Sequence, residues 1–196
     1  MKNFFYLFIV AALFSACQNT TNTEEPTESV EVDEVAEDNT RSTTSNPLYN
    51  DLMMPTAGGM FRGVEFDMSR EKVYNLETSR STISVYKDET DEELVVTTDM
   101  GKEVLDFADI TYRFDEQGLY GIQVETYATT FEKSEEVFDM IVAYYTEEFG
   151  KRSIADDGYT EFEAYSEKTG YDYKISIKNL EDYEDSFGLY MYFDLQ

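Results

Sequence analysis

The chain has 196 residues, and its 42 acidic side chains outnumber 15 basic ones, which gives a formal net charge of −27. Such a charge repels phosphate backbones and argues against nucleic-acid binding, whereas a basic protein remains a compatible partner. The sequence contains no histidine and a single cysteine, Cys17. These absences exclude histidine-dependent catalysis, histidine zinc sites, internal disulfides and CxxC redox chemistry.

Residues 1–17 read MKNFFYLFIVAALFSAC, which is the layout of a secretory signal: one basic residue, an apolar run and two small residues. The apolar run from Phe4 to Phe14 is too short for a spanning helix, which needs about 20 apolar residues. Ordinary signal cleavage before Cys17 would need a small side chain three positions before the cut, where Phe14 stands. The pattern therefore favours neither a transmembrane anchor nor an ordinary cleaved leader.

The run from Leu13 to Cys17 (LFSAC) resembles the lipobox of bacterial lipoproteins, with Phe14 in place of the usual Leu or Val. The resemblance implies that residues 1–16 are a signal peptide and that Cys17 carries diacylglycerol on its sulfur. It also implies a further acyl chain, such as palmitate, on the Cys17 amine. Gln18 follows, whereas lipoproteins retained in the inner membrane of enteric bacteria have Asp there. The resemblance thus implies a cell-envelope protein anchored by lipid in the outer membrane.

Residues 18–46 differ in composition from everything that follows them. They contain no aromatic residue, and eight acidic side chains stand against one arginine. Such a segment cannot bury enough apolar surface to offset its ordering entropy, and its like charges repel one another. We therefore predict that 17–46 is a lipidated cysteine followed by a disordered acidic tether.

From Pro47 onward the aromatic content rises, and apolar and polar residues begin to alternate, so 47–196 is predicted to be the globular domain. Ser69 followed by Glu71 predicts a capped helix start, and apolar spacing predicts a second helix over 131–149 that Gly150 ends. Alternation predicts seven strands, near 82–87, 93–98, 106–114, 119–128, 158–166, 171–178 and 187–195. The expected fold class is α+β, with two helices packed on a largely antiparallel sheet or sheets. The expected order is helix, four strands, helix, three strands, which leaves open a duplication of two helix-plus-meander halves.

The stretch FRGVEFDMSREKV, from Phe61 to Val73, resembles the "F..I..GMS.EEV" opening of small envelope modules. These include the beta-lactamase-inhibitor-protein-like domains and the small lipoprotein of the outer-membrane barrel-assembly machinery. Asp67 stands where those families usually have Gly. The resemblance implies binding rather than catalysis, although a strand end, a serine cap and an apolar helix face also explain every residue of the stretch.

Acidic side chains gather at 88–93, 156–157 and 181–185, but none of these groups has the D-x-D-x-D-G spacing of a calcium loop. We therefore predict no metal site and no cofactor. With so many acids, adjacent carboxylates are inevitable and single out no acid-base pair, and no GxSxG nucleophile motif is present. The sequence favours a protein that is not an enzyme.

The alternation in the last predicted strand indicates on which face of the sheet its two tyrosines lie. Its residues Phe187, Leu189, Met191, Phe193 and Leu195 alternate toward the core, which leaves Tyr190 and Tyr192 on the opposite face. With Tyr171 and Tyr173, they form the candidate binding face, an aromatic platform for peptide or glycan if no helix covers it.

These observations predict a membrane-anchored envelope lipoprotein that serves as a noncatalytic protein-binding or assembly module. Two alternatives stay open. One is an immunity or inhibitor lipoprotein, whose acidic surface would neutralise a basic toxin or enzyme. The other is a hydrolase that depends on carboxylates or on calcium.

Overall fold

A computed structural model describes residues 44–80, 83–86, 92–183 and 186–196, all within one compact unit that runs from Asp38 to Gln196. The predicted signal peptide, Cys17, nearly all of the tether and the acidic turn at 88–91 lie outside the described residues. In the part of the chain that is described, no helix is both long and apolar enough to cross a membrane.

The described residues form three α-helices, a short 3-10 helix and eight strands. The helices are α1 (Pro47–Met53), α2 (Arg70–Thr78) and α3 (Phe131–Phe149), with the 3-10 helix at Pro55–Ala57. The strands are β1 (Ile83–Tyr86), β2 (Glu93–Asp99), β3 (Phe107–Asp115), β4 (Gly118–Tyr127), β5 (Ser153–Ile154), β6 (Thr160–Tyr165), β7 (Asp172–Tyr183) and β8 (Ser186–Leu195). They form one antiparallel sheet in the order β1-β2-β3-β4-β8-β7-β6-β5.

The predicted α+β class and antiparallel pairing are confirmed, and every predicted strand is present, but the expected element order was wrong in two places. Helix α1 and the 3-10 turn precede the first predicted helix, and β5 adds a fourth strand after α3. Both elements are too short to show periodicity. Helix α1 has seven residues, starts at Pro47 and is capped by the Asn46 side chain, which accepts from the Tyr49 amide. Strand β5 has two exposed residues.

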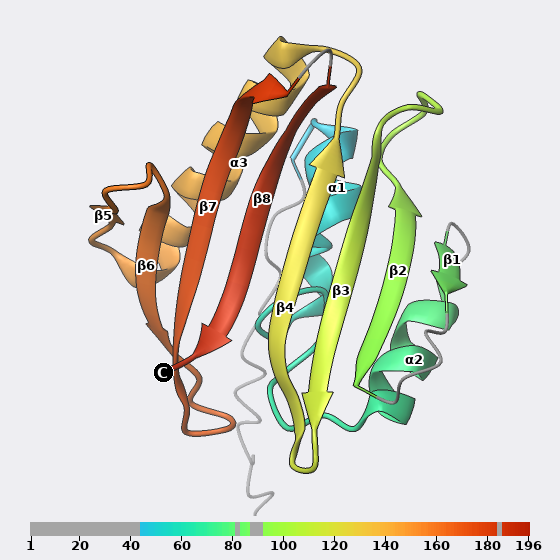
Figure 1. Cartoon of the computed structure of the whole chain (residues 1–196), viewed down its shortest axis with the longest axis vertical. Helices are drawn as coiled ribbons and strands as arrows, with labels where there is room; N and C mark the ends of the chain where they lie inside the picture. The colour runs from blue at the N-terminus through green and yellow to red at the C-terminus, as the bar shows by residue number, and fades with distance from the viewer. Residues whose placement is uncertain (1–43, 81–82, 87–91, 184–185) are drawn as a thin grey trace, which may run out of the picture. The chain divides into compact units, whose positions relative to one another are not determined.

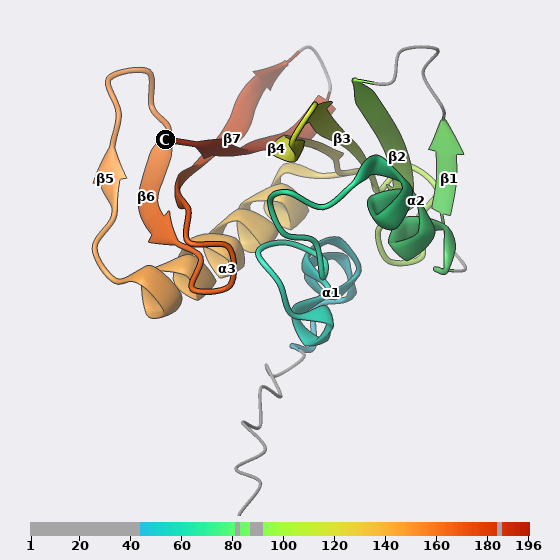
Figure 2. The same ribbon diagram turned by 90° about the horizontal axis from the view of Figure 1, so that it is seen from below.

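All three helices pack on the same face of the sheet (Figure 2). Figure 1 looks onto the opposite face, which no described helix covers. The burial pattern of the strands agrees with this arrangement. Alternate residues of β3, such as Ile110 and Tyr112, are fully buried, while their neighbours are half-exposed. Helix α3 contributes Val137, Ile141 and Tyr145 to the same core. The described helices therefore cover the sheet on one side only.

The chain path places β8 in the middle of the sheet. Strands β1 to β4 form one meander and β5 to β8 another, and α3 connects them (Figure 1). The last strand of the second meander pairs with the last strand of the first, with Tyr190 opposite Glu125 and Tyr192 opposite Gln123. The two tyrosines of β8 consequently lie near the centre of the sheet and not at an edge.

Helix α2 starts where the sequence predicts. The Ser69 side chain accepts from the Lys72 amide, and Val73 is fully buried. Asp67, two residues before the Ser69 cap, has φ of 62°. That value lies in the left-handed region, which glycine and, to a lesser degree, Asp and Asn adopt most readily.

A buried carboxylate, Glu77 of α2, joins the helices to the sheet. It accepts hydrogen bonds from Arg62 Nε at 3.2 Å, Arg62 Nη2 at 3.1 Å and the Tyr112 hydroxyl at 2.6 Å, and it also pairs with Arg80. Glu77 and Tyr112 are 0% exposed and Arg62 is 1% exposed. We call these four residues the Glu77 cluster.

Arg62 extends the cluster to the first helix. Its Nη1 donates to the carbonyl oxygens of Asp51, at 2.6 Å, and Leu52, at 3.0 Å, in the last turn of α1. Carbonyls at the C-terminal end of a helix have no hydrogen-bond partner within the helix, and they carry the negative end of its dipole. A guanidinium supplies both the missing donors and a positive charge. Arg62, which lies in the loop before α2, thus connects α1 to α2 and, through Glu77, to Tyr112 of β3.

Removing the charge of Glu77 should destabilise the whole fold. In Glu77→Gln, the cationic groups of Arg62 and Arg80 lose their buried counter-ion, so we expect the free energy of unfolding to fall by about 3–5 kcal/mol. Urea denaturation measures the change. Glu71→Gln, an exposed position on the same helix, should change it by less than about 0.5 kcal/mol. Equal effects of the two variants would contradict a structural role for the cluster.

The cluster should also make stability depend on pH. Burial alone would raise the pKa of Glu77, but hydrogen bonds and charge from Arg62, with bonds from Arg80 and Tyr112, hold it below its ordinary value of 4.5. A carboxyl with a lowered folded pKa contributes stability above its unfolded pKa and loses it as the pH falls through the folded pKa. We expect the free energy of unfolding to decrease below pH 4.5, and less steeply in Glu77→Gln. Urea denaturation over a pH series measures both slopes, and parallel slopes would contradict the assignment.

Candidate functional site

The face of the sheet seen in Figure 1 carries side chains in rows that the strand register defines. We call it the open face. Its rows, read across β3, β4, β8 and β7, are Phe107–Tyr127–Gly188–Leu180, Asp109–Glu125–Tyr190–Lys178, Thr111–Gln123–Tyr192–Ser176 and Arg113–Gly121–Asp194–Lys174. The open face therefore combines aromatic, polar and charged side chains, and charged residues stand in two of the four rows.

Aromatic rings cross the open face in two groups, one of two rings and one of three. Phe107 stacks on Tyr127 with ring centroids 4.5 Å apart, Tyr190 stacks on Tyr192 at 6.3 Å, and Tyr192 contacts Tyr159 at 5.9 Å. All five side chains are half-buried. We call these residues the aromatic strip. Rings in such a position can stack on a ligand while their hydroxyls form hydrogen bonds.

Glu125 lies between two tyrosines of the strip. The Tyr190 hydroxyl donates to Glu125 Oε1 at 2.7 Å, and this bond, together with burial, raises the pKa of Tyr190 above its ordinary value. Burial, followed by the hydrogen bond to Glu125, raises the pKa of Tyr127 to about 12. Both phenols therefore stay protonated at physiological pH and orient the carboxylate.

The basic side chains of the open face have partners on the same face. Arg113 pairs with Asp194 at 3.1 Å and Lys174 with Glu161 at 2.9 Å. Lys178 lies 5.4 Å from the Tyr159 ring centroid and donates to the Asp157 carbonyl oxygen at 2.8 Å. These contacts leave Glu125 with phenols as its partners.

The structure separates the four tyrosines that the sequence assigns to one face. Tyr190 and Tyr192 lie on the open face as predicted. Tyr173, in contrast, is 4% exposed and packs against Phe66 and Phe149 on the face that the helices cover. Tyr171 is half-buried at the border of the same core. The two therefore do not belong to the open face.

The alternation used for β8 would have detected this difference. In β7, Tyr173 has the same parity as Ile175 and Ile177, which are fully buried, so it must face the core with them. The same rule finds Tyr127 and Glu125 on the open side of β4. Phe107, Tyr127 and Glu125 were missed because their association with β8 depends on strand order, which the sequence does not reveal.

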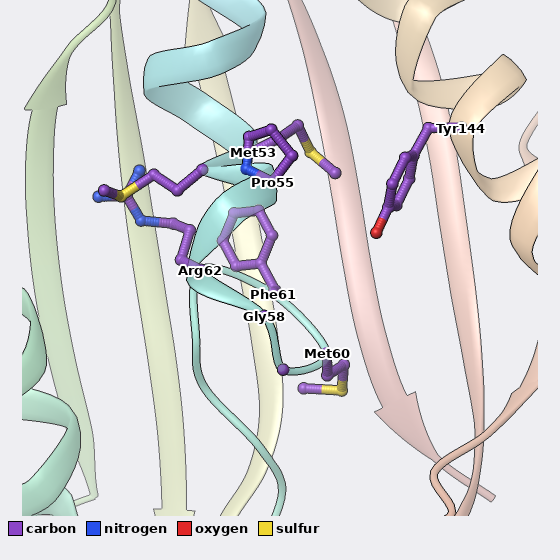
Figure 3. A pocket seen from close by; sticks show the side chains of 9 residues that line it. Met53, Pro55, Gly58, Met60, Phe61, Arg62 and Tyr144 are labelled. Atoms are coloured by element: carbon purple, nitrogen blue, oxygen red, sulfur yellow. The ribbon is translucent and has the colours of Figure 1, made fainter. Parts of the chain in front are cut away.

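One small cavity lies beside the Glu77 cluster. A cavity next to Arg62 lies between α1, the following loop and α3, and Figure 3 shows Tyr144 reaching toward it while Arg62 points away. Its volume is about 10 Å³, which holds at most about one water molecule. Among the described residues, no group of three or more His, Cys, Asp or Glu side chains is placed to hold a metal ion.

Comparisons with family models, curated proteins and solved structures found no match to the chain. The chemistry of the open face is therefore the basis on which a function can be inferred.

The contacts of Glu125 can be tested by titrating the tyrosines. We expect Tyr127 to titrate with a pKa of about 12. Glu125→Gln keeps an acceptor but removes the charge, so the pKa values of Tyr127 and Tyr190 should both fall, and that of Tyr190 should fall more because its bond to Glu125 is the largest cause of its shift. Carbon-13 NMR of ring-labelled tyrosine measures this, with Tyr→Phe variants for assignment. Glu163→Gln, also on the open side of the sheet, should change neither pKa, and an equal shift there would contradict the contact.

Proposed function

We propose that this chain is a noncatalytic binding module, that its ligand is another protein, and that the open face is the binding site. The observation that carries the proposal is the aromatic strip at the centre of a sheet whose described helices all pack on the other face. Tyrosine is enriched at the centres of protein interfaces, because its ring buries a large area at low entropic cost and its hydroxyl satisfies a hydrogen bond.

The shape of the open face favours a protein over a small molecule. Small-molecule sites are usually concave pockets of roughly 300–1,000 Å³ that enclose most of the ligand. The hollow within the strip, beside Tyr127 and Tyr190, has a volume of about 210 Å³. The rest of the strip lies along a sheet surface, which a partner can cover but which cannot enclose a metabolite.

The lipid anchor on Cys17 belongs to the same proposal. It would hold the module at the cell envelope, at the outer membrane, and the acidic tether at 17–46 would let the open face reach a partner away from the bilayer. The formal charge of −27 favours a basic partner by electrostatic steering. An inhibitor of a basic protein would be a specialised form of this function.

Site-specific cross-linking in cells tests the proposed site. A photoreactive phenylalanine analogue replaces Gln123, next to Tyr192 at the centre of the open face, and in a matched chain replaces Glu147, an exposed position on α3. We expect a discrete adduct from position 123 and none from position 147. Adducts from both positions, or from position 147 alone, would contradict the assignment of the face.

Loss of a central ring should weaken binding more than loss of a peripheral one. A central interface tyrosine contributes about 2 kcal/mol, so Tyr192→Ala should reduce affinity for the cross-linked partner roughly 30-fold. Tyr165→Ala is the matched control, because Tyr165 is 55% exposed on β6 outside the strip. Biolayer interferometry with the purified partner measures both variants. Equal losses would contradict the central role of the strip.

A further inference from the structure

We infer that the hollow beside Gly188 receives a basic side chain, lysine or arginine, of the protein partner; this inference rests on the proposed function. Its lining includes Glu125, Tyr127, Leu180, Phe187, Gly188 and Tyr190. We call it the Gly188 hollow. It lies within the aromatic strip, beside Tyr127 and Tyr190, and Leu180 of β7 forms part of its lining.

The hollow exists because one position in a row of side chains has no side chain. Gly188 stands between Tyr127 of β4 and Leu180 of β7 in the register. A Cβ added at Gly188 would lie 1.8 Å from the Thr126 carbonyl oxygen, so the close approach of β4 and β8 requires glycine at this position. The side chains around Gly188 form the walls of the hollow, whose volume is about 210 Å³.

The walls and rim of the hollow suit a cation on an apolar stem. Leu180 and the Tyr127 ring provide apolar and aromatic surface, and the Glu125 carboxylate lies at the rim. A carboxylate has about four lone-pair positions, so Glu125 can accept a further donor beyond its two phenols. Lysine and arginine place their methylenes on apolar surface and their charge on a carboxylate or an aromatic face.

Two carboxylates stand side by side next to the hollow. Asp109 of β3 stands directly opposite Glu125 in the register, and like charges in that position repel. Within the described part of the chain neither carboxylate takes part in an ion pair, since Arg113 and Lys174 pair with Asp194 and Glu161. A cation from the partner would relieve this repulsion, whereas an acidic side chain would increase it.

Ligand-observed NMR on the full chain in detergent tests the inference. The probes are N-acetyl-arginine methylamide, N-acetyl-lysine methylamide and the neutral N-acetyl-norleucine methylamide, followed by saturation transfer from the protein. We expect transfer to both basic probes and at least about tenfold weaker binding of the neutral one. Glu125→Gln should weaken binding of the basic probes by about tenfold or more.

Glu163→Gln separates a specific site from general attraction to an acidic protein. It removes the same charge from an exposed position of β6 and should bind the basic probes as the unaltered chain does. Losses as large as in Glu125→Gln would overturn the inference, as would equal binding of the norleucine probe. The urea midpoint of each variant verifies that it is folded.

The outcomes also separate this inference from the proposed function. A cross-link from position 123 together with no binding of either basic probe would overturn the inference and leave the binding module standing. Failure of the cross-link and of the probes together would overturn both. Selective binding of the basic probes that depends on Glu125 supports the inference.

Discussion

The structure depends on a carboxylate that is buried among cations. Removing Glu77 from water costs several kcal/mol, and the cost is offset only because Arg62, Arg80 and Tyr112 satisfy its oxygens. Through Arg62 the same contacts reach the end of α1. The cluster fastens α1 and α2 to one face of the sheet, and α3 packs on the same face through its own apolar residues Val137, Ile141 and Tyr145. No described helix therefore lies on the open face.

The elements of the fold were predictable where a pattern repeats over several residues. Strand alternation and the apolar spacing of α3 are such patterns, and α3 has the predicted bounds. Short elements such as α1 lack a repeat. The Glu77 cluster was also beyond prediction, since Glu77 lies 15 residues from Arg62 and 35 from Tyr112. In the sequence it resembles any acidic residue on an exposed helix.

The candidate site was predictable in part for the same reason. Alternation within β8 is a local property, so Tyr190 and Tyr192 could be assigned to the open side. The role of Gly188 depends on Thr126 of β4, and the neighbouring Leu189 amide donates to the Thr126 hydroxyl across 63 residues of sequence. A contact at that distance requires the strand order, which composition and periodicity do not encode.

In the central strands, alternate residues have two different roles, since one set packs in the core and the other lies on the open face. In β8, Met191 and Phe193 maintain the core while Tyr190 and Tyr192 meet the solvent. Substitutions at Tyr190 and Tyr192 should therefore cost less stability than substitutions at Met191 and Phe193, which packing constrains. Homologous chains with this architecture should retain the inward residues and diverge at the outward ones. A lineage could exchange one ligand for another without passing through an unfolded intermediate, which is a favourable starting point for evolving new specificity.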